Sequence, residues 1–107
     1  MSNSTNECVF CDIISNKADA SFVFKGEKVT AFMDLNPINK GHVLVVPNQH
    51  QERFTDLDND VTSEMFSTAQ TILKAIEKSN INCEGTNLFL SDGEVAGQEV
   101  LHSHLHI

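Results

Sequence analysis

Three of the five histidines stand at alternate positions near the end of the chain, in the run His102-Ser103-His104-Leu105-His106-Ile107. Alternate side chains of an extended strand point to the same face, so the spacing predicts three imidazoles on one face, about 7 Å between successive members. Near pH 7 an imidazole can act as a nucleophile, a general acid or a metal ligand, as its neighbours dictate. The run therefore predicts a catalytic or metal-binding site, since packing alone rarely produces it.

A second group with possible chemistry lies near the other end of the chain. Cys8 and Cys11 are separated by two residues, in a chain with three cysteines in all. This spacing suits a metal site or a redox pair better than a framework of structural disulfides, so we expect reduced thiols. An isolated CxxC motif often has no metal-binding role, and a metal site here would need further ligands from elsewhere in the chain.

The elements that carry these groups follow from the apolar periodicity. Helical spacing predicts a short helix from Cys8 to about Ser15 and a long one from an N-cap at residues 58–60 to about Ser79. Runs typical of strands cover 21–25, 28–34, 42–47, 87–90 and 99–107, and the first two form a hairpin. Segment 42–47 is almost wholly apolar, which indicates a central strand buried on both faces. We therefore predict an α+β fold with an antiparallel sheet of about five strands.

Length and charge limit the classes of partner. The 107 residues suffice for one domain, with residues 1–6 expected to be loose. A formal net charge of -8 repels phosphate backbones, which argues against general nucleic-acid or anionic-membrane binding. Small anions remain possible ligands, because backbone N–H groups and imidazoles can attract them locally. No apolar stretch reaches the roughly 20 residues of a membrane span, so a cytoplasmic location is expected.

Four segments, taken in chain order, carry a resemblance that covers nearly the whole chain. They are Cys8–Cys11, residues 31–37, residues 41–50, and residues 97–107 with the histidine run. Together they resemble the histidine triad (HIT) family of nucleotide hydrolases and transferases, in its zinc-containing bacterial-type branch. The resemblance implies a single HIT domain over 1–107 that forms a homodimer through the long helix and an edge strand. Relatives generally continue beyond the position at which this sequence stops.

The catalytic roles that the resemblance implies centre on His104. In the family the middle histidine attacks the α-phosphorus of a nucleotide and forms a nucleotidyl-histidine, while a backbone carbonyl holds its ring proton. His106 would contact the phosphate or the leaving group, and His42 would complete the network from a neighbouring strand. Gln98 resembles the family residue that binds a phosphate or bridging oxygen.

The resemblance also implies where the nucleotide binds. Asp34 would accept the ribose hydroxyls, although it could instead shape the turn that follows it. Two positions depart from relatives: Ser91 replaces an asparagine, and Glu99 replaces a smaller hydroxyl residue and would repel phosphate unless it points away. The three apolar residues of this site, Phe10, Phe32 and Leu35, are more safely regarded as core residues that could also line the pocket. The implied nucleotide site comprises Phe10, Phe32, Asp34, Leu35, Ser91, Gly97, Gln98, Glu99, His104 and His106.

A structural zinc ion is the expected cofactor. Cys8, Cys11, His50 and His102 match the ligands of this branch of the family, and two thiolates with two imidazoles suit tetrahedral zinc. The metal would fasten the N-terminal segment to the catalytic segment, a role in folding rather than in catalysis. The alternative for His50, which follows a proline in an expected loop, is an unligated surface residue.

The function implied is hydrolysis of a purine nucleotide conjugate, either a dinucleoside polyphosphate or a nucleoside phosphoramidate, with release of AMP. Two alternatives stay open. A nucleotide-binding or interaction protein with little catalysis would keep the same histidines, so turnover separates it from an enzyme. A pure metal-binding domain could use the three imidazoles as transition-metal ligands and would have no affinity for nucleotide. Cys83 has no assigned role.

Overall fold

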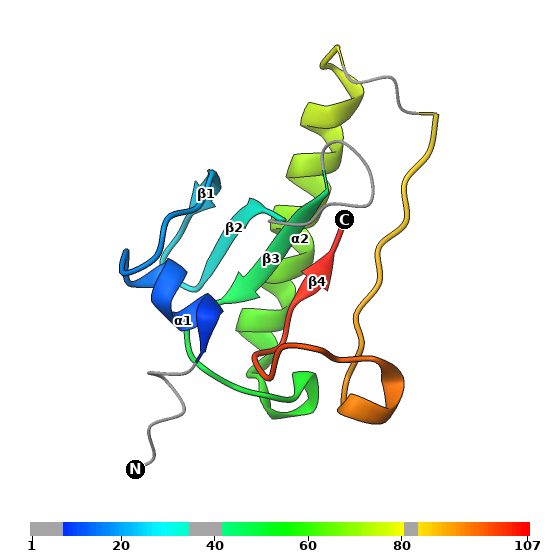
Figure 1. Cartoon of the computed structure of the whole chain (residues 1–107). Coiled ribbons are helices and arrows are strands. Elements are labelled where there is room, and N and C mark those ends of the chain that lie inside the picture. The colour runs from blue at the N-terminus through cyan, green and yellow to red at the C-terminus, as the bar shows by residue number, and fades with distance from the viewer. Residues whose placement is uncertain (1–7, 35–41, 81–83) are drawn as a thin grey trace.

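The computed structural model describes residues 8–34, 42–80 and 84–107 (Figure 1). Four strands pair antiparallel in chain order, β1-β2-β3-β4, and form one sheet. The expected hairpin is confirmed as β1 and β2, closed by the Gly26 N–H, which donates to the Val29 carbonyl at 2.8 Å. The elements are α1 (Val9–Ile14), β1 (Phe22–Lys25), β2 (Val29–Met33), β3 (Val43–Pro47), η2 (Phe54–Asp56), α2 (Asn59–Glu77), η3 (Glu94–Ala96) and β4 (Leu105–His106).

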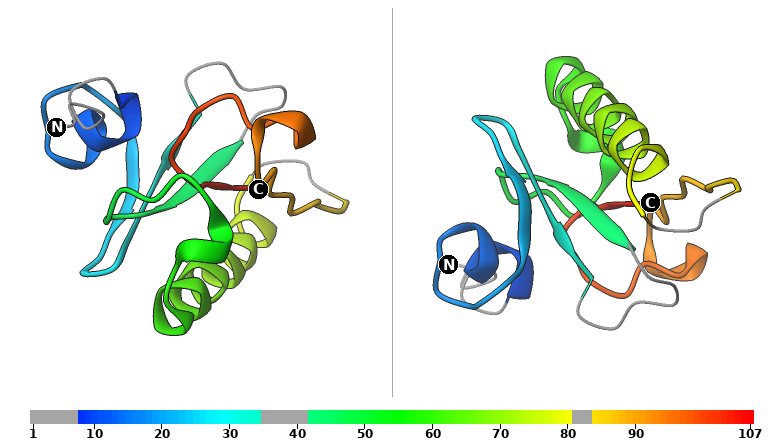
Figure 2. Two further views of the ribbon diagram at one scale, coloured as in Figure 1. Left: turned by 90° about the horizontal axis from the view of Figure 1, so that it is seen from below. Right: turned by 90° about the horizontal axis from the view of Figure 1, so that it is seen from above.

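The two α-helices cover opposite faces of the sheet (Figure 2). Alternating residues of β3 account for this, because Val43 and Val45 belong to the apolar cluster of α2, whereas Leu44 and Val46 belong to the cluster of α1. All five residues of β3 are buried. The prediction of a central strand covered on both sides is confirmed, as is the α+β class.

Helix α2 buries one side only, with Met65, Thr68, Ala69 and Ile72 against the sheet. No helix in the described ranges is long and apolar enough to span a bilayer. Met65 is fully buried, whereas Gln70 on the same helix is exposed.

Met65→Ala should lower the free energy of unfolding by about 2–5 kcal/mol, because it removes apolar contacts and leaves a cavity. Gln70→Ala should change it by less than about 0.5 kcal/mol. Urea denaturation of both variants measures the difference, and similar effects would contradict this packing.

The sequence prediction was wrong about the last two strands. Segment 87–90 is reduced to one isolated bridge, between Phe89 and His106. The strand expected over 99–107 is confined to Leu105–His106, so the sheet has four strands in the part of the chain that the structure describes. Two of the three triad histidines precede the last strand.

Backbone hydrogen bonds explain the late start of β4. Gly97 adopts a left-handed conformation with φ of 102°, which turns the chain before the triad. The His102 N–H then donates to the Val100 carbonyl at 2.9 Å, and the Ser103 N–H donates to the Gln51 carbonyl at 2.8 Å. These groups are bonded to a turn and to a loop, so they are not available to a strand ladder.

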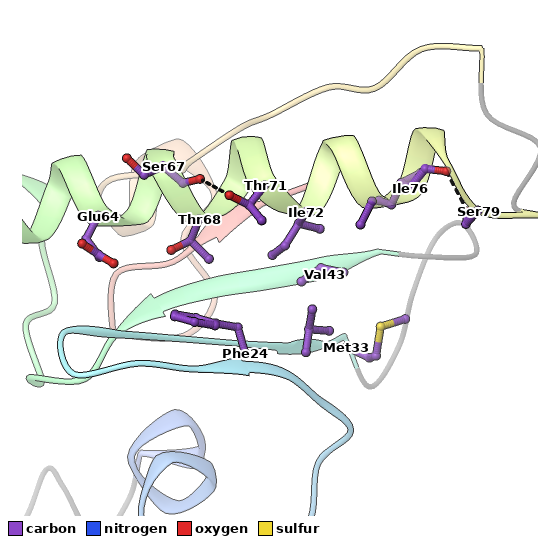
Figure 3. A pocket seen from close by; sticks show the side chains of 12 residues that line it. Phe24, Met33, Val43, Glu64, Ser67, Thr68, Thr71, Ile72, Ile76 and Ser79 are labelled. Atoms are coloured by element: carbon purple, nitrogen blue, oxygen red, sulfur yellow. Dashed lines mark hydrogen bonds between the residues drawn. The ribbon is translucent and has the colours of Figure 1, made fainter.

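A cavity of about 530 Å³ lies between α2 and the sheet (Figure 3). Its walls include Phe24, Met33, Val43, Thr68 and Ile72, and no histidine or cysteine is among its lining residues. Because none of the triad histidines lines it, this cavity is not part of the site described next.

Candidate catalytic and metal site

His104 is buried, and one of its ring nitrogens is bound to the backbone. Its Nδ1 lies 2.8 Å from the His102 carbonyl oxygen. A carbonyl only accepts, so Nδ1 carries the hydrogen and Nε2 keeps a free lone pair. Burial lowers the pKa of His104 below its ordinary 6.5, although that hydrogen bond, Asp34 and Glu99 act in the opposite direction. The imidazole is therefore neutral near pH 7, the state that a nucleophile requires.

The ring of His106 contacts three other rings, those of Phe89, His104 and His42. Its ring is stacked on Phe89, with 4.1 Å between centroids and 7° between planes, and lies 4.7 Å from the His104 ring. Burial, with His104 and His42 close by, lowers the pKa of His106 to about 4. Phe89 was not among the predicted site residues, because in the sequence it looks like an ordinary apolar residue of a strand until its pairing with His106 is known.

His42 connects His106 to a carboxylate. Its Nδ1 lies 3.4 Å from Asp34 Oδ2, and its Nε2 lies 3.2 Å from His106 Nδ1. Because a carboxylate only accepts, any hydrogen between these two groups is carried by His42 Nδ1. Asp34 thus has a contact within the histidine network, which the sequence did not reveal.

A second group of donors gathers where α1 meets the turn before β4. Cys8 Sγ lies 3.4 Å from His102 Nδ1, and Cys11 Sγ lies 3.2 Å from His50 Nδ1 and 3.6 Å from His102 Nδ1. All four donor atoms lie within 4.8 Å of one another. In tetrahedral zinc, a sulfur and a nitrogen ligand are about 3.5 Å apart. The donors predicted for zinc therefore lie together at distances that fit the ion.

A hydrogen bond to the backbone turns His102 toward the two cysteines. Its Nε2 lies 2.8 Å from the Pro47 carbonyl, so Nε2 carries the hydrogen and Nδ1 faces the cysteines with its lone pair. Burial lowers the pKa of His102 to about 4, which keeps the imidazole unprotonated. Burial and the neighbouring Cys8 raise the pKa of the Cys11 thiol to about 12, so a metal ion would have to displace its proton.

The residues expected around the base are partly core residues. Phe10 and Phe32 are buried and meet edge to face at 5.5 Å, and the Phe10 ring also lies 5.0 Å from the ring of His104. Glu99 is exposed, whereas Ser91 is half-buried. Leu35, also predicted for this pocket, is outside the described residues.

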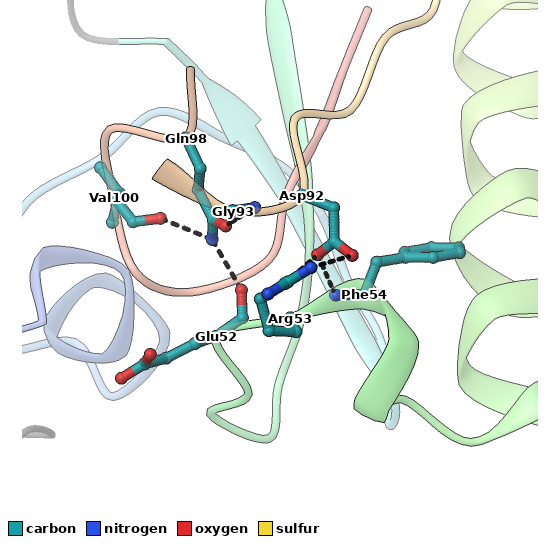
Figure 4. Close-up of polar contacts among 7 residues, drawn as sticks. All are labelled: Glu52, Arg53, Phe54, Asp92, Gly93, Gln98 and Val100. Carbon is teal, nitrogen blue, oxygen red and sulfur yellow. Dashed lines mark hydrogen bonds and ion pairs between the residues drawn. The ribbon is translucent and has the colours of Figure 1, made fainter. Parts of the chain in front are cut away.

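Gln98 uses its whole amide within the loop that precedes the triad (Figure 4). Its Oε1 accepts the Gly93 N–H at 2.7 Å, and its Nε2 donates to the carbonyls of Glu52 at 2.6 Å and Val100 at 3.0 Å. Beside it, Asp92 accepts the Phe54 N–H at 2.6 Å and pairs with Arg53. In this arrangement Gln98 joins the loop to the segment after β3. Contact with a phosphate would require its amide to break one of these hydrogen bonds.

Gln98→Ala should lower the free energy of unfolding by about 2 kcal/mol, because buried groups lose their partners. Gln98→Glu should be at least as destabilising, since a carboxylate cannot donate to the two carbonyls. Thermal denaturation of both variants measures this. A Gln98→Ala protein that loses activity at unchanged stability would point to direct contact with substrate instead.

Residues 15–107 match the family of the HIT domain. An uncharacterized HIT-like protein of Methanocaldococcus jannaschii is 41% identical over 100 residues, which are 94% of this chain and 76% of that protein. The adenylylsulfatase HINT3 of Arabidopsis thaliana is 31% identical over 102 residues, 95% of this chain and 51% of that protein.

The fold is also found in a solved structure with metal. The zinc-bound histidine triad family protein from Mycobacterium smegmatis superposes with a TM-score of 0.90 at 34% identity, over 95% of this chain and 73% of that one. The arrangement of sheet and helices is therefore that of a known family.

Proposed function

Because the chain belongs to the HIT family, we propose that it is a nucleotide-binding hydrolase. It releases a nucleoside monophosphate, with AMP as the expected product, through a nucleotidyl intermediate on His104. The observation that carries the proposal is the hydrogen bond between His104 Nδ1 and the His102 carbonyl, 2.8 Å long. It fixes the tautomer and leaves Nε2 as the nucleophile.

The proposed reaction has two displacements. His104 Nε2 attacks the α-phosphorus, a nitrogen–phosphorus bond forms, and the bond from phosphorus to the leaving oxygen or nitrogen breaks with its electron pair on the leaving atom. Water then attacks the same phosphorus, the nitrogen–phosphorus bond breaks, and the lone pair returns to Nε2. In the first displacement the leaving atom takes up one proton from solution. In the second, the nucleoside monophosphate leaves with the water oxygen, and the two protons of that water pass to solution, so that one of them replaces the proton taken up before.

The neighbouring groups have supporting roles in this proposal. His106 lies 4.7 Å from the His104 ring, close enough to contact the phosphate or the leaving atom. His42 and Asp34 hold His106 from behind, through the 3.2 Å and 3.4 Å contacts. Asp34 also remains the proposed acceptor for the ribose hydroxyls, with Phe10 and Phe32 beside the base. Glu99 is exposed, which allows it to point away from phosphate.

A structural zinc ion is proposed for Cys8, Cys11, His50 and His102. The donor distances and the zinc-bound relative support this assignment. When bound, the ion would supply a rigid link between α1 and the turn before β4, not Lewis-acid chemistry. Because the His102 carbonyl orients His104, a ligand of the metal and the partner of the nucleophile are the same residue.

The test compares two leaving groups. The protein is incubated with an adenosine phosphoramidate and with a diadenosine polyphosphate, and products and peptides are analysed by mass spectrometry. AMP in solution, together with a nucleotidyl group on the peptide that contains the triad, is the expected result, and the faster substrate identifies the leaving group. Bound nucleotide without AMP and without adduct would favour a binding protein. A homodimer is proposed as well, and light scattering tests it.

A further inference from the structure

We propose that Asp34, His42 and His106 form a second metal site, for a divalent transition ion such as Zn²⁺, Co²⁺ or Cu²⁺. One donor atom from each of the three residues lies within 4.8 Å of the other two. None of them belongs to the group of Cys8, Cys11, His50 and His102. The two sites therefore share no ligand.

The distances suit a small ion with nitrogen ligands. His42 Nε2 and His106 Nδ1 are 3.2 Å apart, close to the roughly 3.3 Å that separates two nitrogens around tetrahedral zinc. Asp34 offers a carboxylate oxygen within 4.8 Å of a ring nitrogen of each histidine, so it can supply the third ligand. The flat stack of Phe89 on His106, 4.1 Å between centroids, limits movement of that ligand.

Asp34 and His106 are half-buried and His42 is buried, which leaves one side of the site open to solvent. The side chain of His42 is 9% exposed and that of Asp34 is 21% exposed. Three protein ligands with solvent on one side leave room for water as a further ligand. Such a site exchanges its ion more readily than a closed site with four protein ligands.

Donor chemistry sets the order in which the sites fill. The cysteine-containing group offers two thiolates, which zinc binds strongly, whereas the second site offers two imidazoles and one carboxylate. The first equivalent of zinc should therefore enter the cysteine site, and only excess metal should enter the second. If the proposed function holds, an ion on Asp34 and His106 occupies two groups that the nucleotide needs, so excess metal inhibits competitively with nucleotide.

The test uses protein that already holds one zinc ion per chain, titrated with Co²⁺ and followed by equilibrium dialysis and visible absorption. One further Co²⁺ should bind, with d–d bands and no sulfur-to-cobalt charge transfer. Asp34→Asn and His106→Gln should each weaken that binding at least about tenfold. The controls are Asp58→Asn, an exposed carboxylate at the start of α2, and His104→Gln, an imidazole next to the site. Both should retain the second ion.

The outcomes separate this inference from the proposed hydrolase. No second Co²⁺ in wild-type protein, or one that both ligand variants retain, would overturn the site. The His104→Gln variant separates the two proposals. If the proposed reaction holds, this variant is inactive, and if the metal site holds, it binds Co²⁺ as the wild-type protein does. Loss of that Co²⁺ would contradict the ligand assignment, even if hydrolysis proceeded as proposed.

Discussion

Replacement of His104 by alanine is expected to lower kcat/KM for AMP release by at least about 10³-fold, because removal of a nucleophile removes the covalent route. Nucleotide affinity should change little, since the ribose and base contacts are proposed for other residues. Steady-state kinetics and calorimetry with a non-hydrolysable nucleotide measure the two effects. The adduct on the triad peptide should be absent from the variant.

Ser103→Ala is the matched control. Ser103 is the neighbour of His104, it is buried, and its hydroxyl makes no hydrogen bond with any described residue. Removing an unsatisfied buried hydroxyl should leave stability unchanged or raise it slightly, with turnover retained. A His104→Ala protein whose activity stays within tenfold of the Ser103→Ala protein would exclude His104 as the nucleophile.

The parts of the fold that sequence could predict are those with strong local patterns. The apolar residues of α2 recur every three or four positions, and those of β3 run without interruption, so each element was predicted close to its observed limits. The end of the chain was predicted less well. There, alternate histidines suggested a long strand, whereas contacts with residues distant in sequence decide the conformation of 98–104.

In the candidate site, too, residues that are close in sequence could be predicted, whereas contacts between distant residues could not. The triad and the CxxC pair are visible in the sequence because their members are close together along the chain. His50 reaches the cysteines only through folding, and it was assigned by resemblance to a family. The contacts of Asp34 with His42 and of Phe89 with His106 join positions that share no local pattern, so sequence alone could not indicate them.

Removal of the proposed structural zinc is expected to have the largest effect on stability. A ligand present at a thousandfold excess over its Kd stabilises the folded state by about 4 kcal/mol, and each kcal/mol corresponds to about 4–8 °C in a domain of this size. Chelation of zinc, or Cys11→Ser, should therefore lower Tm by at least about 15 °C. Differential scanning calorimetry with and without chelator measures the change, and zinc but not magnesium should restore it.

Ser15→Ala distinguishes loss of the metal from local damage to α1. Ser15 follows the same helix, is exposed, and its hydroxyl donates to the Cys11 carbonyl at 2.9 Å, so its replacement should cost only a few degrees and leave zinc binding intact. The Cys11→Ser protein should in addition lose activity below its Tm, because without the metal His102 is held only by its hydrogen bonds to Pro47 and Val100, and its carbonyl orients the nucleophile less firmly. A chelated protein that melts at the same temperature as the zinc-loaded one would show that these four residues do not hold a structural ion.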